Sequence, residues 1–135
     1  MSHLQIPPPR SPPRHRLLVV DDDRDCADSI CEFIALSSDW DVAVACGIEQ
    51  AILSAEQNPP DVVLMEVEMQ GQDGFAFAAR LAQNRHGKAP VMLSLTANEK
   101  LCDEASMDTR FSGSLMKPVD TSRLLQVLAQ LDALH

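Results

Sequence analysis

The stretch LLVVDDDRD, residues 17–25, joins a short run of apolar, β-favouring residues to three consecutive aspartates. Three later apolar runs also lead into polar or charged residues: VVLMEV (62–67), VMLSL (91–95) and GSLM (113–116). A fifth run, WDVAVA at residues 40–45, alternates weakly between apolar and other side chains. We predict that these five runs are β-strands, because each is short and rich in β-favouring residues.

Segments with a helical spacing of apolar residues follow each of these runs. The first places Ala27, Ile30, Cys31 and Ile34 on one helix face. Four more helices are predicted at residues 48–57, 75–83, 98–107 and 121–134, with loops at QGQDG (70–74) and RHGKAP (85–90). Continuous apolar strands that alternate with helices are typical of a parallel sheet covered on both faces. The sequence therefore predicts a doubly wound α/β fold with five strands and five helices.

The length and composition indicate one globular domain with an N-terminal tail. The chain has 135 residues, of which 45% are hydrophobic and 23% charged, an ordinary mix for a folded domain. Residues 1–16 hold five of the nine prolines and three arginines, so we predict a disordered Pro/Arg-rich tail. Residues 17–135 are predicted to form the domain.

The charge of the predicted domain is strongly acidic, with 8 basic and 20 acidic residues after position 16. This excess argues against direct nucleic-acid binding, which needs a basic surface. No apolar run is long enough to cross a membrane, and no secretory signal is seen, so we expect a cytoplasmic protein. The four cysteines show no metal-binding spacing and are expected to be reduced.

Ionisable and hydroxyl residues lie at or just after the ends of the predicted strands: Asp21, Asp22, Asp23, Glu66, Glu68, Thr96 and Lys117. The carboxyl ends of parallel strands meet at one edge of a sheet, where ligands of this fold bind. Two carboxylates about 5 Å apart repel by about 3 kcal/mol at an effective dielectric near 20, so the cluster needs a cation. Oxygen ligands suit Mg²⁺, and Mg²⁺ with a lysine and a hydroxyl suits a phosphoryl group. Taken singly, these residues have ordinary explanations, such as aspartates that cap a helix.

The motifs LLVVDDDRD, PDVVLMEVEMQGQDG, VMLSLTA and GSLMKPVD together resemble the response-regulator receiver domain of two-component signalling. The resemblance implies a flavodoxin-like sheet of strand order 2-1-3-4-5. It implies that Asp21 and Asp22 hold Mg²⁺, joined by Glu66 and by the backbone carbonyl of Glu68. It also implies that Thr96 contacts the phosphoryl group and that Lys117, before a cis proline, is the family's lysine.

Three positions depart from the family pattern. Glu66 stands where the family has its phosphoaccepting aspartate, Gln70 replaces a proline, and Ser114 replaces an aromatic residue that moves on activation. The longer Glu66 side chain displaces its carboxylate by about 1.5 Å, and a misplacement of about 1 Å can cost ~10²-fold in rate. We therefore expect impaired phosphorylation, with Glu66 as a partial mimic of the phosphorylated state.

The resemblance implies a sensor histidine kinase or phosphotransfer protein as one partner. A downstream protein would dock on the face formed by residues 98–107, 113–116 and 121–134. Because the chain ends soon after the last predicted helix, we expect output by protein binding and no enzymatic activity. Coupling to this face is expected through Thr96 and residues 97–100.

Two versions of this function stay open on the sequence. In one, the receiver works in a phosphorelay and Glu66 locks or disables it. In the other, it is a phosphorylation-independent interaction module. Two rivals are a Mg²⁺-dependent phosphatase-like hydrolase and a flavin-binding module. The hydrolase would need a substrate cap or deep cleft, for which we expect no spare segment in 135 residues. The flavin module would need a phosphate-binding loop after the first strand, and the acidic DDDRD is its electrostatic opposite.

Overall fold

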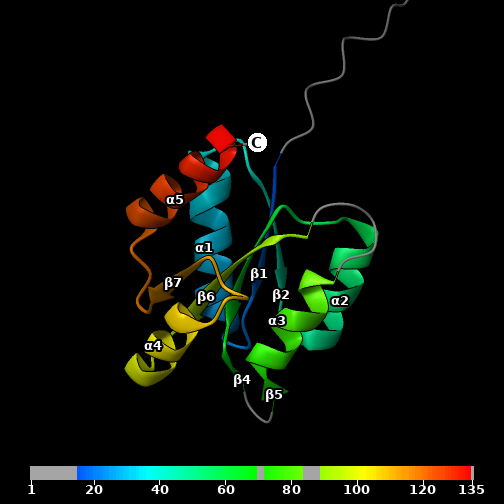
Figure 1. The fold of residues 1–135 in the computed structure, drawn as a ribbon. Coiled ribbons are helices and arrows are strands. Elements are labelled where there is room, and N and C mark those ends of the chain that lie inside the picture. The colour runs from blue at the N-terminus through cyan, green and yellow to red at the C-terminus, as the bar shows by residue number, and fades with distance from the viewer. Residues whose placement is uncertain (1–14, 70–71, 84–88, 135) are drawn as a thin grey trace, which may run out of the picture.

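The fold is known from a computed structural model, which describes residues 15–69, 72–83 and 89–134 (Figure 1). The strands of the main sheet are β1 (Arg16–Val20), β2 (Asp41–Ala45), β3 (Val62–Glu66), β6 (Val91–Thr96) and β7 (Gly113–Met116). Two short strands, β4 (Glu68–Met69) and β5 (Gln72–Asp73), pair antiparallel with each other. The helices are α1 (Arg24–Ser37), α2 (Ile48–Gln57), α3 (Gly74–Ala82), α4 (Glu99–Met107) and α5 (Thr121–Leu134).

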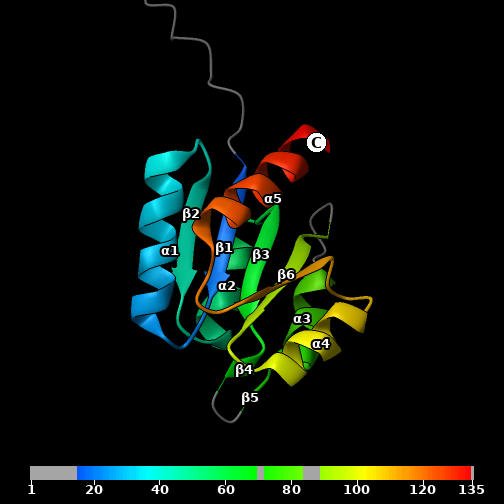
Figure 2. The same cartoon turned by 90° about the vertical axis from the view of Figure 1, so that its left-hand side faces the viewer.

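The main sheet is parallel throughout and has the strand order β2-β1-β3-β6-β7. Counted among the five main strands, this is the order 2-1-3-4-5, so the predicted flavodoxin-like fold is confirmed. Helices α1 and α5 cover one face of the sheet, and α2, α3 and α4 cover the other (Figures 1 and 2). A parallel sheet needs such crossover helices, because its strands all run in one direction.

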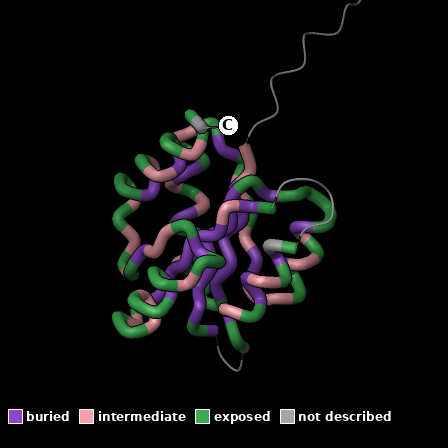
Figure 3. Tube along the Cα trace, viewed as in Figure 1, coloured by how far each residue is buried: buried purple, intermediate pink, exposed green. Residues whose placement is uncertain are grey.

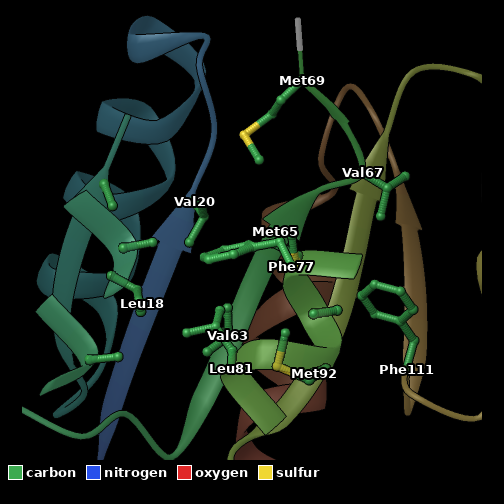
Figure 4. Close-up of a cluster of buried hydrophobic side chains, with 14 of the residues drawn as sticks. Leu18, Val20, Val63, Met65, Val67, Met69, Phe77, Leu81, Met92 and Phe111 are labelled. Atoms are coloured by element: carbon green, nitrogen blue, oxygen red, sulfur yellow. The ribbon is translucent and has the colours of Figure 1, made fainter. Parts of the chain in front are cut away.

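Both faces of the central strands are buried (Figure 3). Along β1, Leu17 and Val19 pack beneath α1 and α5, whereas Leu18 and Val20 pack beneath α2 and α3 (Figure 4). Successive strand residues point to opposite faces, so a strand covered on both sides must be apolar at every position. The uninterrupted LLVV run is therefore a consequence of the central position of β1.

Strand β2 lies at an edge of the sheet, and only the last of its five residues is buried. This position explains the weak alternation of WDVAVA, because an edge strand keeps contact with solvent.

Polar side chains cap the start of four helices, including α5, where the carboxylate of Asp120 accepts from the backbone N–H of Arg123 at 3.1 Å. Asp23 precedes α1 and accepts a hydrogen bond from the backbone N–H of Cys26 at 3.2 Å. Asp73 caps α3, and Asn98 caps α4. Each cap satisfies an N–H group that has no partner within its own helix. Capping, the ordinary explanation for an aspartate run, thus applies to Asp23.

Several predicted boundaries shift in the structure. Strand β1 begins at Arg16, and the predicted loop 70–74 holds strand β5 and the first residue of α3. The pairing of β4 with β5 depends on backbone bonds, which a side-chain pattern does not reveal. The predicted tail, apart from its last two residues, and the motif residue Gln70 lie outside the described residues. Among the described residues, no helix is long and apolar enough to span a membrane.

Candidate functional site

The carboxyl-end edge of the sheet brings together residues that are up to 96 positions apart in the sequence. Asp21 directly follows β1, Glu66 ends β3, Thr96 ends β6 and Lys117 directly follows β7. The parallel register aligns these ends, with Glu66 opposite Leu95 and the N–H of Lys117 bonded to the Thr96 carbonyl at 2.9 Å. The predicted meeting of these four positions at one edge of the sheet is therefore observed.

Lys117 forms two ion pairs at the centre of this edge. Its Nζ lies 2.8 Å from Oδ2 of Asp21 and 3.2 Å from Oε1 of Glu66. Asp21 is fully buried and Glu66 is only 5% exposed, whereas the lysine side chain keeps 16% of its surface in solvent. One ammonium thus compensates two buried carboxylates, which leaves the group with a net negative charge.

Backbone N–H groups hold the two carboxylates in place. Asp21 Oδ1 accepts from the N–H of Asp23 at 2.9 Å, and Glu66 Oε2 accepts from the N–H of Glu68 at 3.2 Å. Both oxygens of Glu66 are therefore engaged. Asp21 Oδ2, which is buried, meets the ammonium of Lys117 at 2.8 Å and therefore shares this cation with Glu66.

The burial of this group shifts the acid–base equilibria of two residues. Burial raises the pKa of Glu66, although the N–H of Glu68 and the ammonium of Lys117 act in the opposite direction. Burial by itself lowers the pKa of Lys117, but the contacts with Asp21 and Glu66 outweigh it, and the net pKa is raised. Lys117 is therefore a persistent cation at neutral pH.

Thr96 is buried at the same edge, but its hydroxyl bonds to the next loop. Oγ1 of Thr96 accepts from the N–H of Asn98 at 3.1 Å, and the side chain of Asn98 accepts from the N–H of Leu101 at 3.2 Å. This chain of bonds connects the end of β6 with the first turn of α4.

The side chains of the other two predicted site residues are directed differently. Asp22 and Glu68 are exposed, in contrast to the buried carboxylates of Asp21 and Glu66. Glu68 contributes its backbone N–H to Glu66. Within the described parts of the chain, no three histidine, cysteine or carboxylate side chains are gathered in a way that could hold a metal ion.

The contact between Ser94 and Ser114, next to the site, was not predicted from the sequence, which pointed only to Ser114 as a departure from the family pattern. The hydroxyl groups of Ser94 on β6 and Ser114 on β7 lie 2.8 Å apart, and Ser94 is fully buried. The sequence feature that could have indicated this contact is a serine inside the apolar run VMLSL. In the register of β6 and β7, this serine lies opposite Ser114. The peptide bond between Lys117 and Pro118 is cis, as the resemblance implies.

A five-stranded parallel sheet of this order, with carboxylates and one lysine gathered at its carboxyl-end edge, defines a CheY-like α/β domain. The chain belongs to the response regulator receiver domain family, whose sequence model matches residues 17–129. This family consists of the receiver domains of two-component signal transduction.

Relatives among known proteins agree with this assignment. The chain is 30% identical to an uncharacterized 14.6 kDa protein of Leptolyngbya boryana over 115 residues, which are 84% of this chain and 87% of that protein. It is 28% identical to the sensory transduction protein LytT of Bacillus subtilis over 84% of this chain and 46% of LytT. The chain thus spans less than half the length of LytT.

Solved structures show the same fold. The chemotaxis response regulator CheY4 of Vibrio cholerae has a TM-score of 0.74 and 22% identity, covering 88% of this chain and 99% of CheY4. A CheY-like receiver domain protein of Methanospirillum hungatei has a TM-score of 0.76 and 21% identity, covering 90% and 96% of the two chains.

Proposed function

We propose that this chain is a receiver that signals by protein–protein interaction and whose acceptor position, Glu66, is poorly phosphorylated. The observation that carries the proposal is the contact between Lys117 Nζ and Glu66 Oε1 at 3.2 Å, with Oε2 bonded to a backbone N–H. A carboxylate engaged at both oxygens is a poor nucleophile toward a phosphodonor. The longer glutamate side chain carries one negative charge further toward the lysine than an aspartate would, which makes it a partial mimic of a phosphorylated acceptor.

The partners follow from the family in general terms. Receiver domains interact with histidine kinases or phosphotransfer proteins and with downstream targets. For this chain we propose a downstream protein partner on the face of α4, β7 and α5, where the side chains of Met107 and Met116 are 83% and 38% exposed. We propose that the chain works as a cytoplasmic signalling module without catalytic turnover of its own. A phosphorylation-independent receiver is the version of this function that a fixed carboxylate favours.

Phosphorylation provides the direct test. Incubated with acetyl phosphate and Mg²⁺, the chain should gain an 80 Da adduct about 10²-fold more slowly than its Glu66→Asp variant, because the glutamate carboxylate is displaced by more than 1 Å. Intact-mass spectrometry over time measures both rates. Glu68→Asp is the matched control, since it shortens an exposed carboxylate that is outside the ion-pair group.

Rapid and complete labelling of the unchanged chain at Glu66 would contradict the proposal. An adduct that persists after Glu66→Gln would show another acceptor and would contradict it as well.

Mg²⁺ is the metal that the family implies at the carboxyl-end edge of the sheet, where the residues present supply oxygen ligands. Asp21 Oδ2 is a buried carboxylate oxygen that already binds a cation, the ammonium of Lys117 at 2.8 Å, and oxygen donors of this kind suit Mg²⁺. Among the described residues, Asp22 and Glu66 are not gathered around Asp21 as metal ligands. Binding would therefore require these carboxylates, with the backbone carbonyl of Glu68, to close on the ion in competition with Lys117. The metal would supply positive charge to the carboxylates and to phosphoryl oxygens.

Binding of Mg²⁺ should stabilise the folded chain. At a concentration tenfold above its dissociation constant, the gain is about 1.4 kcal/mol, because the metal binds only the folded state. Thermal unfolding with and without MgCl₂ measures the shift, with KCl of equal ionic strength as the salt control. The shift should vanish in Asp21→Asn, whereas an equal shift in both chains would rule out this site.

A further inference from the structure

Arg110, in the loop between α4 and β7, makes a group of directed contacts. Its Nε and Nη2 donate to the two carboxylate oxygens of Asp108 at 2.9 and 2.6 Å. Its Nη1 donates to the backbone carbonyl of Phe75 in the first turn of α3 at 2.9 Å. The planar guanidinium therefore reaches two acceptors in different parts of the fold at once, a geometry that lysine cannot reproduce.

Aromatic contacts reinforce the same junction. The guanidinium carbon of Arg110 lies 5.7 Å from the ring centre of Phe75, and that ring meets Phe111 edge-on at 5.8 Å. Phe111 is buried on the α2–α3–α4 face of the sheet, as are Phe77 and Met92 (Figure 4). We refer to Asp108, Arg110, Phe111 and Phe75 as the α3–α4 clasp.

One end of the clasp is tied closely to the acceptor position. Val67, the residue after Glu66, is buried, and its N–H bonds to the Leu95 carbonyl at 3.1 Å. Gly74, which directly precedes Phe75, packs so closely on the Val67 backbone that an added Cβ would lie 2.6 Å from its Cα. A displacement of the backbone at 66–67 therefore acts directly on the start of α3.

The other end of the clasp holds the C-terminal end of α4. Asp108 is the C-cap residue of this helix, and Ala105 is its only buried residue. A helix with one fully buried residue has low local stability, so contacts at its C-cap contribute to holding its last turn in place. The exposed Met107 is the last residue of this turn.

We propose that Arg110 is a positioning residue that couples the segment after Glu66 to the C-terminal end of α4. When Arg110 bonds to both Asp108 and the Phe75 carbonyl, the clasp fixes the last turn of α4 to the start of α3. When these bonds break, the last turn is released. The proposal rests on the proposed function, because it assumes that a change at Glu66 is the signal that the receiver transmits. It assigns a route to the α4 surface that is separate from the Thr96–Asn98 hydrogen bond.

Two properties of the clasp guide the choice of conditions. Hydrogen bonds from Arg110 lower the pKa of Asp108 to about 2, so the pair stays ionised in ordinary buffers. The pair is partly exposed, and salt screens such pairs. Measurements therefore belong at low ionic strength and near pH 7.

The test is a double-mutant cycle read by hydrogen exchange. Glu66→Ala should change the exchange rate of amides at 103–112 about fivefold or more in the natural background, the lower range of typical coupling between sites. In Arg110→Gln the same change should fall to less than about twofold, because the link is missing. Protection of β3 and β6 shows that each variant is folded. Arg80→Gln, which removes an exposed arginine of α3, is the control and should retain the full response.

Each other outcome overturns the proposal. An equal response to Glu66→Ala with and without Arg110 would place the coupling in another route. If Glu66→Ala leaves the exchange rates at 103–112 unchanged when Arg110 is present, the C-terminal end of α4 is not coupled to Glu66. If Arg110→Gln does not fold, Arg110→Lys replaces it, because lysine keeps the positive charge but cannot make the paired hydrogen bonds of the guanidinium. A full exchange response to Glu66→Ala in the Arg110→Lys background would also contradict the proposal. The mass assay on Glu66→Asp judges the proposed function separately, because it involves no measurement on α4.

Discussion

Replacing Lys117 with methionine should lower the free energy of unfolding by about 3–5 kcal/mol at pH 7, the usual cost of removing one partner of a buried ion pair. Asp21 and Glu66, both almost fully buried, would lose the ammonium that lies within 3.2 Å of each. Urea denaturation at low salt measures the loss. Lys100→Met removes an exposed lysine of α4 and should change stability by less than about 0.5 kcal/mol.

The deficit of Lys117→Met should depend on pH with a definite sign. Burial raises the pKa of Glu66, so the folded protein holds this proton more tightly than the unfolded chain. Stability therefore falls as the pH rises above the ordinary glutamate value of about 4.3. Without the ammonium this pKa rises further, so the deficit should be largest near neutral pH and should shrink as the pH falls to about 4.

The positively charged Lys117 also makes the stability of the unchanged protein depend on pH. Its raised pKa means that its stabilisation is complete below about pH 10.4 and is lost only as the pH rises through the folded value. Adding Glu66→Gln to Lys117→Met should restore part of the lost stability, because it removes one unpaired charge. A loss no larger than that of Lys100→Met, or one that does not vary with pH, would contradict this account of the ion pairs.

Replacing Gly74 with alanine should cost about 3 kcal/mol, the upper end of the usual range for overpacking. The new Cβ would lie 2.6 Å from Val67 Cα and 2.7 Å from its carbonyl oxygen. Both atoms belong to a buried backbone that is bonded to β6, so no side-chain rotation relieves the contact. Either α3 or the strand end that carries Glu66 must move. Thermal or urea unfolding measures the loss.

Gly47 offers the matched control for this substitution. It precedes α2, and a Cβ built on it would meet nothing within 4 Å. Gly47→Ala should therefore cost less than about 1 kcal/mol, the effect of a poorer helix cap. Equal losses at the two glycines would show that the close approach of Gly74 to Val67 is not what decides the cost.

The sequence was sufficient to predict the type and order of the main elements. LLVV and VVLMEV were recognisable because central strands of a covered parallel sheet must be apolar on both faces. Asp21, Glu66, Thr96 and Lys117 could be predicted to lie at one edge, because the carboxyl ends of parallel strands coincide. The antiparallel pair of β4 and β5 could not be predicted in the same way, since it depends on backbone pairing between Glu68–Met69 and Gln72–Asp73.

The sequence by itself determined the fold class, the family and the group of residues at the sheet edge, because these depend on local patterns and on residue type. Only the tertiary structure decided which of those residues touch: Lys117 pairs with Asp21 and Glu66, whereas Thr96 bonds to Asn98 and Asp22 faces solvent. It also joined Ser94 to Ser114 and Arg110 to Phe75. The physical reason is that strand register and side-chain direction arise from packing across the whole domain, over separations that no local pattern records.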